Sequence, residues 1–325
     1  MIRFLLRRLA FFVLTLFLTS LLIFALTRVL PGDVAQVILG REATDAALEA
    51  TREELGLNEP LLVQYVDWAA SFFTGDLGQT FSSPRRDINE LLGARVLNSG
   101  RLAALTLLLA VPLAVTLGVV AGLSEGKFAD GLISILSLSV VSLPEFVTGL
   151  FLINVVALGM RQLPIIQSLD WWFPASSSIN PNATFSEALP FLWLPAITAT
   201  LVLLAYVIRL VRAGVIEELK KDYVNTATLK GIPRRRVVFN HVLRNALIPT
   251  VTVIATSTGW LLSGLVVIEF VFNYPGLGRL LIFAINNRDL PLVQAIVMVT
   301  VVIILIANFT ADILYAVLNP RIKLA

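Results

Sequence analysis

Cysteine is absent from this sequence of 325 residues, and histidine occurs once, at His241. The lack of cysteine excludes disulfide bonds and thiolate metal sites, and a single histidine excludes a histidine metal cluster. Charged residues are also scarce, at 14% of the chain, whereas soluble domains contain about 25%. Because 57% of the residues are hydrophobic, the composition predicts an integral membrane protein without a metal site.

A phosphate-binding loop is missing as well. The segment GLSEGKF at residues 122–128 has a partial likeness to one, but its spacing is wrong. Phe128 stands where such a loop needs Ser or Thr to hold the metal ion. We therefore expect no nucleotide site, no catalytic residue and no cofactor bound by this chain.

Six long apolar runs are the main feature that is present. A helix needs about 20 apolar residues to cross a bilayer. The runs cover residues 9–26, 102–123, 132–158, 189–208, 246–268 and 292–318. Gly118 and Gly122 in the second run form a small-residue pair that allows close helix packing. We predict an all-α membrane protein with six transmembrane helices.

The first run has a basic head, as a signal peptide does. It is longer than the apolar part of a signal peptide, about 7–15 residues, and no small-x-small cleavage motif follows it. We therefore expect it to be retained as a transmembrane helix. Basic residues also follow the fourth and sixth runs, so the positive-inside rule predicts that both termini are cytoplasmic.

A hydrophilic insert, residues 31–100, follows the first run. It contains eleven acidic and five basic residues, so the positive-inside rule does not place it in the cytoplasm. The pattern predicts two helices, about Asp45–Leu55, capped by Thr44, and about Pro60–Phe73. The second has an apolar stripe beside Trp68, which we expect to pack on the outer ends of the membrane helices.

The largest basic segment follows the fourth run. It contains nine Lys and Arg residues between Arg209 and Arg244, which places it in the cytoplasm. We expect Asp222 to cap a short helix over Tyr223–Lys230, and Gly231 to end it. Pro233 suits the first turn of a second helix. Such a short helix can dock into a groove on another protein, and the alternative is a basic loop lying on anionic lipid.

Glu145 lies in the middle of the third run, beside Pro144. A charged side chain at the bilayer centre costs at least about 2.5 kcal/mol, so an ionisable residue there is a functional candidate. Glu145 would face a wet cavity of a translocation pathway, pair with another subunit or stay protonated, and the cavity is the preferred interpretation. One alternative function is a proton-coupled secondary transporter with Glu145 and Asp312 as titrating groups. A second is a membrane scaffold with no pathway.

Several motifs in order along the chain carry a family resemblance. They are LLIFALTRVLPGD, REELGLNEPLLVQY followed by GDLG, DYVNTATLKG with HVLRNALIP, VFNYPGLGRLL, RDLPLVQA and DILYAVLNPRIK. Together they resemble a permease subunit of a binding-protein-dependent ABC importer, in the dipeptide, oligopeptide and nickel family. The resemblance covers nearly the whole chain. The long insert is similar to that of the first of the two permeases in such systems.

This resemblance implies a type I ABC importer permease fold in the bacterial inner membrane. It implies a first helix within residues 1–30, a periplasmic insert over 31–100 and a five-helix core over 101–325. The implied partners are a second, homologous permease, two cytoplasmic ATPases that bind ATP and Mg²⁺, and a periplasmic or lipid-anchored binding protein. The implied activity is ATP-driven import of di- or oligopeptides, with glutathione and nickel chelates as further possible substrates.

The resemblance also gives the basic segment a role. Residues 209–245 are similar to the EAA loop, whose short helix docks on the ATPase. Ala227 and Gly231 match the motif's second alanine and its glycine, whereas Asn225 and Thr226 depart from its glutamate and first alanine. The residues that we expect to carry the coupling are Asp222, Tyr223, Val224, Asn225, Thr226, Ala227, Leu229, Lys230 and Gly231. Of these, Tyr223, Val224, Ala227 and Leu229 are expected to fill the groove on the ATPase.

Overall fold

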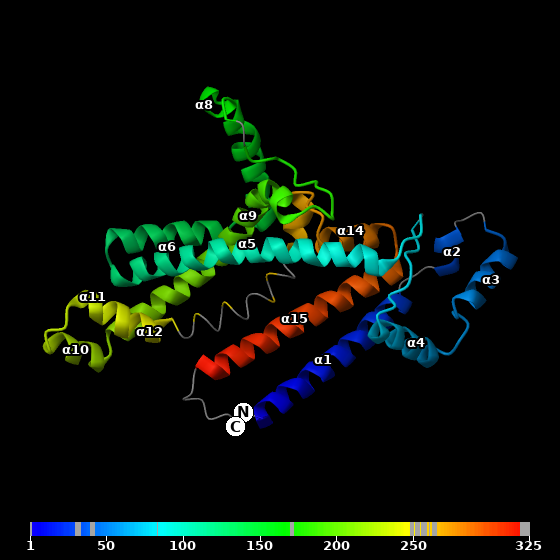
Figure 1. Cartoon of the computed structure of the whole chain (residues 1–325), viewed down its shortest axis with the longest axis horizontal. Helices are drawn as coiled ribbons and strands as arrows, with labels where there is room; N and C mark the ends of the chain where they lie inside the picture. The colour runs from blue at the N-terminus through cyan, green and yellow to red at the C-terminus, as the bar shows by residue number, and fades with distance from the viewer. Residues whose placement is uncertain are drawn as a thin grey trace.

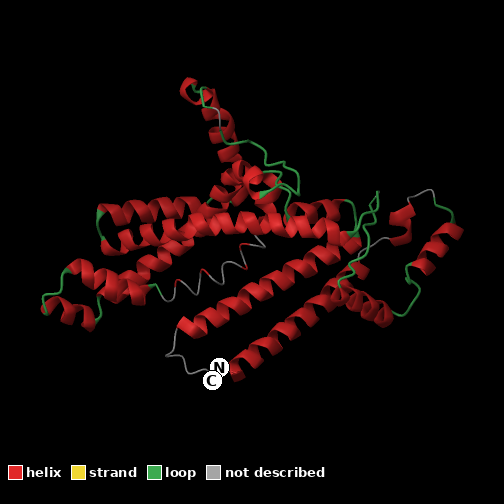
Figure 2. Cartoon of the chain, in the orientation of Figure 1, coloured by secondary structure: helices red, strands yellow, loops and turns green. Residues whose placement is uncertain are grey.

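The structure is a computed structural model that describes residues 2–29, 34–39, 43–82, 84–169, 172–247, 250, 254, 259, 261 and 265–318. Its regular elements within these ranges are helices, and Figure 2 shows them joined by loops. One isolated β-bridge joins Gln79 and Asp87. The prediction of an all-α protein is confirmed for the described residues.

Four helices in the described part are long and apolar enough to cross a membrane. They are α1 (Ile2–Val29), α5 (Ile88–Leu123), α9 (Phe185–Leu219) and α15 (Leu290–Leu318). A bent pair of helices makes a fifth candidate if it counts as one span. The predicted span over residues 246–268 lies largely outside the described residues, so the count of six stays a prediction.

Two helices begin earlier in the chain than the predicted spans, which started at residues 102 and 189. Helix α5 begins at Ile88, because the Asp87 side chain accepts a hydrogen bond from the Asn89 amide at 2.7 Å. Helix α9 begins at Phe185, after a capping box formed by Thr184 and Glu187. The sequence interpretation had each helix begin where its apolar run begins. The capping side chains set the true limits.

The predicted third span over residues 132–158 does not form one helix. The chain forms α6 (Phe128–Val141) and α7 (Glu145–Phe151), and the axes of the helical segments 128–141 and 145–162 differ by 101°. Pro144 occupies the N-cap position of α7. Proline has no backbone N–H and disfavours helical conformation in the residue before it, so the helix breaks here.

An arm continues beyond the break. It runs from α7 through a π-helical segment, η1 (Leu152–Gly159), and a short turn, η2 (Met160–Gln162), to α8 (Pro164–Gln167). Figure 1 shows α8 at the far tip of this arm, away from α5 and α9. Many of its apolar side chains are exposed, as expected for a surface that faces lipid or another subunit.

Helices α5 and α9 form the centre of the molecule. A Cβ atom added at Gly118 would lie 2.6 Å from Val211 Cβ, and one at Gly122 would lie 2.7 Å from Val215 Cβ. The two backbones therefore approach more closely than any larger residue would allow, which confirms the predicted close packing of this small-residue pair.

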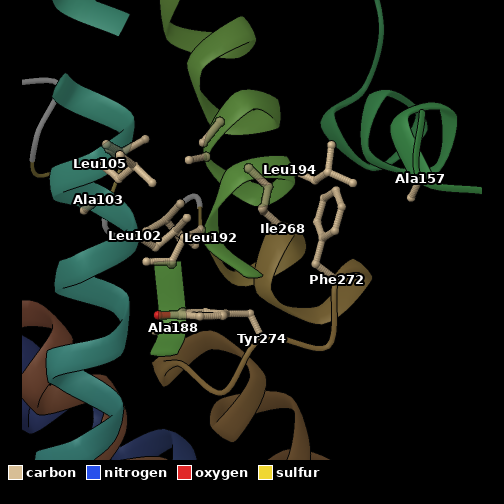
Figure 3. Packing of buried hydrophobic residues seen from close by; sticks show 14 residues of the cluster. Leu102, Ala103, Leu105, Ala157, Ala188, Leu192, Leu194, Ile268, Phe272 and Tyr274 are labelled. Atoms are coloured by element: carbon tan, nitrogen blue, oxygen red, sulfur yellow. The ribbon is translucent and has the colours of Figure 1, made fainter. Parts of the chain in front are cut away.

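A cluster of buried apolar side chains joins α5 and α9 to helical residues 265–271. Figure 3 shows Leu102 and Leu105 of α5 near Leu192 of α9, with Tyr274 beneath them. The Tyr274 hydroxyl donates a hydrogen bond to the Asn98 carbonyl oxygen at 3.1 Å. This cluster fixes the end of the molecule that carries α14 (Leu277–Asn286).

The insert has the two predicted helices, and a short helix, α2 (Val34–Leu39), precedes them. Helix α3 (Asp45–Glu54) starts after Thr44, whose side chain accepts a hydrogen bond from the Ala47 amide, and α4 (Leu61–Thr74) ends at a glycine in left-handed conformation. The predicted apolar stripe packs only in part. The Tyr65 hydroxyl and Ser20 Oγ lie 2.8 Å apart, and the Trp68 ring contacts Phe24 of α1. Leu61 and Leu62 are exposed.

Candidate coupling site

The predicted short helix is present at the end of α9. Helix α10 (Asp222–Leu229) has Lys221 at its N-cap, so Asp222 is the first helical residue and the prediction that it caps the helix was wrong. A carboxylate in the first turn is still stabilised by the helix dipole. Gly231 has a φ of 74°, and its amide donates a hydrogen bond to the Thr228 carbonyl oxygen. Gly231 therefore ends the helix as predicted.

One face of α10 is buried in this chain's own core. Val224 and Ala227 are 7% and 9% exposed, and they pack in one cluster with Val215 of α9 and Val242. These two side chains are therefore not available to a partner in this conformation. Of the four expected to fill the groove, Leu229 is the one that is largely free, at 89% exposed.

Tyr223 is engaged within the chain as well. Its hydroxyl donates a hydrogen bond to Glu218 Oε2 at 2.5 Å and accepts one from Asn245 Nδ2 at 3.3 Å. Burial, and then this bond to the Glu218 carboxylate, raise the pKa of Tyr223. The hydroxyl therefore keeps its proton at neutral pH and remains a donor.

Glu218 is the functional candidate that the sequence interpretation missed. It is 9% exposed, and it accepts hydrogen bonds from Lys221 Nζ and the Tyr223 hydroxyl. The bond to Glu218 raises the pKa of Lys221. The Glu218 carboxylate thus links the end of α9 to Lys221 in the turn and to Tyr223 in α10. The available signal was the spacing of Glu218 and Lys221, which places them on one side of the turn.

The other face of α10 is open. Asn225, Thr226, Leu229 and Lys230 are exposed. After Gly231 the chain forms a second helical stretch, from α11 (Arg234–Val237) through a π-helical turn, η3 (Val238–Val242), to α12 (Leu243–Ala246). Pro233 stands at its N-cap rather than within its first turn. This stretch supports α10 through the shared core.

The three arginines at residues 234–236 are exposed on the first turn of α11. Arg235 lies over the Phe239 ring at 5.9 Å. Among the residues that the structure describes, none forms an ion pair with them. They remain free to meet an acidic surface.

Glu145 and Asp312 differ in their surroundings. Glu145 is half-buried at the first residue of α7, directly after the break, and has no hydrogen-bond or ion-pair partner among the described residues. Asp312 of α15 pairs with Arg8 of α1 at 3.0 Å. Asp312 is thus engaged in holding the two helices together. In the described part of the chain no cluster of His, Asp or Glu side chains could hold a metal ion.

Comparison with known proteins decides the family. The sequence model of one family, the inner membrane component of binding-protein-dependent transport systems, matches residues 114–324. These residues include α9 through α15. The chain belongs to this permease family. The model of the N-terminal part of such membrane components matches residues 1–87, so it covers α1 and most of the insert.

Relatives match the permease over almost its whole length. It is 35% identical to a probable peptide ABC transporter permease protein of Sinorhizobium fredii, over 98% of this chain and 99% of the relative. It is also 35% identical to the di/tripeptide transport system permease protein DppB of Pseudomonas aeruginosa, over 99% of both chains. A glutathione transport system permease protein, GsiC of Shigella flexneri, is 33% identical over 99% of both.

The family defines the permease as a multi-pass membrane component of an ABC importer rather than a catalytic subunit. Such a component works with an ATPase and with a substrate-binding protein. A proton-coupled secondary transporter finds no support, and the ion pair of Asp312 with Arg8 also weakens that alternative.

Proposed function

We propose that the permease forms half of the pathway of an ATP-driven importer of di- or oligopeptides. The other half is a second, homologous permease, and two cytoplasmic ATPases and an extracytoplasmic binding protein complete the transporter. The relatives named for peptide and di/tripeptide transport support this substrate class. Glutathione, named for a third relative, is the other candidate.

The observation that carries the coupling role is that α10 is anchored on one face and open on the other. The anchored face joins α9 through Glu218, Tyr223 and Val224. The open face presents Leu229. When the ATPases close on ATP, a groove that holds this open face moves α10 and α9 as one body. The nine residues predicted to carry the coupling thus divide into an anchoring group and a docking group.

The proposed topology has six membrane spans, cytoplasmic termini and a periplasmic insert, in a bacterial inner membrane. ATP and Mg²⁺ belong to the ATPases, and this chain binds neither. The basic residues of the α9–α12 segment support a cytoplasmic position for α10. Figure 1 supports a periplasmic insert, because α2–α4 lie at the opposite end of the molecule from α10.

Replacing Gly231 tests both the importer and its coupling helix. In proteoliposomes that contain the whole transporter, we expect Gly231→Leu to reduce peptide uptake at least about tenfold while ATP hydrolysis continues. A Cβ at Gly231 meets open space, but its φ of 74° costs a non-glycine residue about 1–2 kcal/mol. Relief of this strain would tilt α10 away from its docked direction.

Gly75→Leu is the matched control. Gly75 also ends a helix at positive φ in open space, but it lies in the insert. This variant should keep the wild-type ratio of uptake to ATP hydrolysis. Normal uptake by Gly231→Leu would reject the coupling role. Uptake driven by an ion gradient through this permease alone would reject the importer.

Glu145 is the proposed pathway residue. Its side chain has no partner among the described residues, so removing its charge should not disturb packing. We expect Glu145→Gln to change the uptake rate about three- to tenfold, with the assembled transporter present in normal amount. A tenfold change corresponds to about 1.4 kcal/mol. Unchanged transport kinetics would exclude Glu145 from the pathway.

A further inference from the structure

A cavity lies at the end of the molecule opposite α10. It has a volume of about 360 Å³ and is lined by the loop before α5, the first turns of α5, and α14. Three arginines line it, and we call it the arginine pocket: Arg86 from the loop, Arg95 from α5 and Arg279 from α14. Leu91, Leu280 and Phe283 form an apolar wall beside them. Pockets for small ligands typically measure about 300–1,000 Å³.

Few groups of the chain neutralise the charge of the three guanidinium groups or accept their hydrogen bonds. Arg86 and Arg279 lie close enough to repel the charge of the half-buried Arg95. The described residues give the side chains of Arg86 and Arg95 no hydrogen-bond or ion-pair partner, and Arg279 donates to one carbonyl oxygen, that of Asn273, at 3.1 Å. Most of the donors that these side chains carry are therefore unused.

Two buried carboxylates lie nearby, and both are already engaged. Glu269 attracts Arg95, but its oxygens accept hydrogen bonds from Ser99 Oγ at 2.5 Å and from the backbone amides of Gly278 and Arg279. Asp289 accepts from the amide and hydroxyl of Ser82. Neither carboxylate is hydrogen-bonded to the three guanidinium groups, so the pocket keeps an excess of positive charge.

Hydrogen bonds hold the loop that carries Arg86 in a fixed conformation. The Thr80 amide donates to the Arg86 carbonyl oxygen at 3.0 Å, and the Arg86 amide donates to Thr80 Oγ1 at 3.0 Å. The bridge between Gln79 and Asp87 closes the same loop, and the Asp87 cap fixes it to α5. Arg86 is therefore held at the rim while its guanidinium group remains exposed.

We propose that the arginine pocket binds the C-terminal carboxylate of a peptide that has left the binding protein. The proposal rests on peptide import as the function of the permease. Guanidinium groups bind carboxylates through paired, charge-assisted hydrogen bonds. The apolar wall of Leu91, Leu280 and Phe283 lies where the last side chain of such a peptide would pack. Fixed charge beside an apolar wall fits a peptide end better than an inorganic anion.

The test measures binding and transport with one pair of probes, alanyl-phenylalanine and its C-terminal amide. Binding to the purified whole transporter, without binding protein, is measured by saturation-transfer NMR. We expect the wild type to prefer the free acid about tenfold and Arg86→Gln to lower this preference at least threefold. Arg86→Lys, which keeps the charge, should retain part of it. Arg85→Gln is the matched control, since Arg85 is exposed on the same loop but lines a different cavity.

Equal binding of acid and amide by the wild type would overturn the pocket, and so would an Arg86→Gln variant that matches Arg85→Gln. A variant that loses affinity for the binding protein with unchanged preference for the acid would also overturn it, because the pocket would then be a docking site for that protein. Failure of peptide import is a separate result. Acid-selective binding that depends on Arg86, without ATP-driven peptide uptake, would leave the pocket in place and reject the proposed transport function.

Discussion

Replacing Leu229 by aspartate is expected to reduce ATP-driven uptake at least about tenfold while leaving the permease folded. Leu229 is 89% exposed, so the substitution removes almost no internal packing. Burying a leucine in a partner's groove contributes about 1.5–3 kcal/mol, and burying an unpaired carboxylate there costs more still. A loss of 1.4 kcal/mol already corresponds to about a tenfold effect. The measurement is co-purification of the ATPases together with uptake in proteoliposomes.

The control for this prediction is Leu229→Met, which keeps an apolar side chain of similar size and should retain coupling. Because the chain has no cysteine, Leu229→Cys places a single thiol on α10. A membrane-impermeant maleimide should label this thiol from the cytoplasmic side only. Labelling from the outer side, or normal uptake by Leu229→Asp, would contradict the proposed position of α10.

Local signals in the sequence were sufficient for some elements. Thr44 caps α3 through its own side chain and Gly231 ends α10 through its own positive φ, so both roles at helix ends could be predicted directly. The glycine pair at Gly118 and Gly122 was equally readable, since its spacing places both residues on one helix face. Each of these predictions needed only residues within a few positions of one another.

Contacts between residues that lie far apart in the sequence could not be predicted from it. The sequence showed that Val224 and Ala227 are small and apolar, but not that Val215 and Val242 cover them. It therefore assigned them to a partner's groove, although the chain buries them itself. The sharp break before Glu145 was missed for another reason. A proline can kink a helix or end it, and the apolar residues on both sides favoured a kink.

The arginine pocket depends on the same kind of long-range contact. Its three arginines come from the loop before α5, from α5 and from α14. In the sequence, Arg86 and Arg95 are separated from Arg279 by most of the chain. One group that holds α14 against α5, beside the apolar cluster of the two helices, is Glu269, whose carboxylate is fully buried and accepts from the first turn of α14. Glu269 also accepts from Ser99 of α5.

Replacing Glu269 by alanine is therefore expected to destabilise the permease strongly. The change leaves two buried donors without an acceptor, Ser99 Oγ and the Gly278 amide, and it also removes the acceptor of the part-buried Arg279 amide. Each unsatisfied buried donor costs about 1–3 kcal/mol, so we expect a loss of at least about 2 kcal/mol. Removing the carboxylate also takes away the charge that attracts Arg95. Thermal unfolding of the purified transporter measures the loss, together with the amount of permease in the membrane.

Two further variants make this result specific. Glu125→Ala also removes a carboxylate, but Glu125 is half exposed and pairs with Lys220 at the surface, so it should shift the unfolding midpoint little. Gly276→Ala leaves Glu269 in place, but its Cβ would overlap the Glu269 carboxylate, so it should weaken the same contact from the other side. If Glu269→Ala unfolds at the same temperature as Glu125→Ala, the buried carboxylate does not hold α14. Joint destabilisation by Glu269→Ala and Gly276→Ala would instead identify this carboxylate as a group that holds α14 against α5.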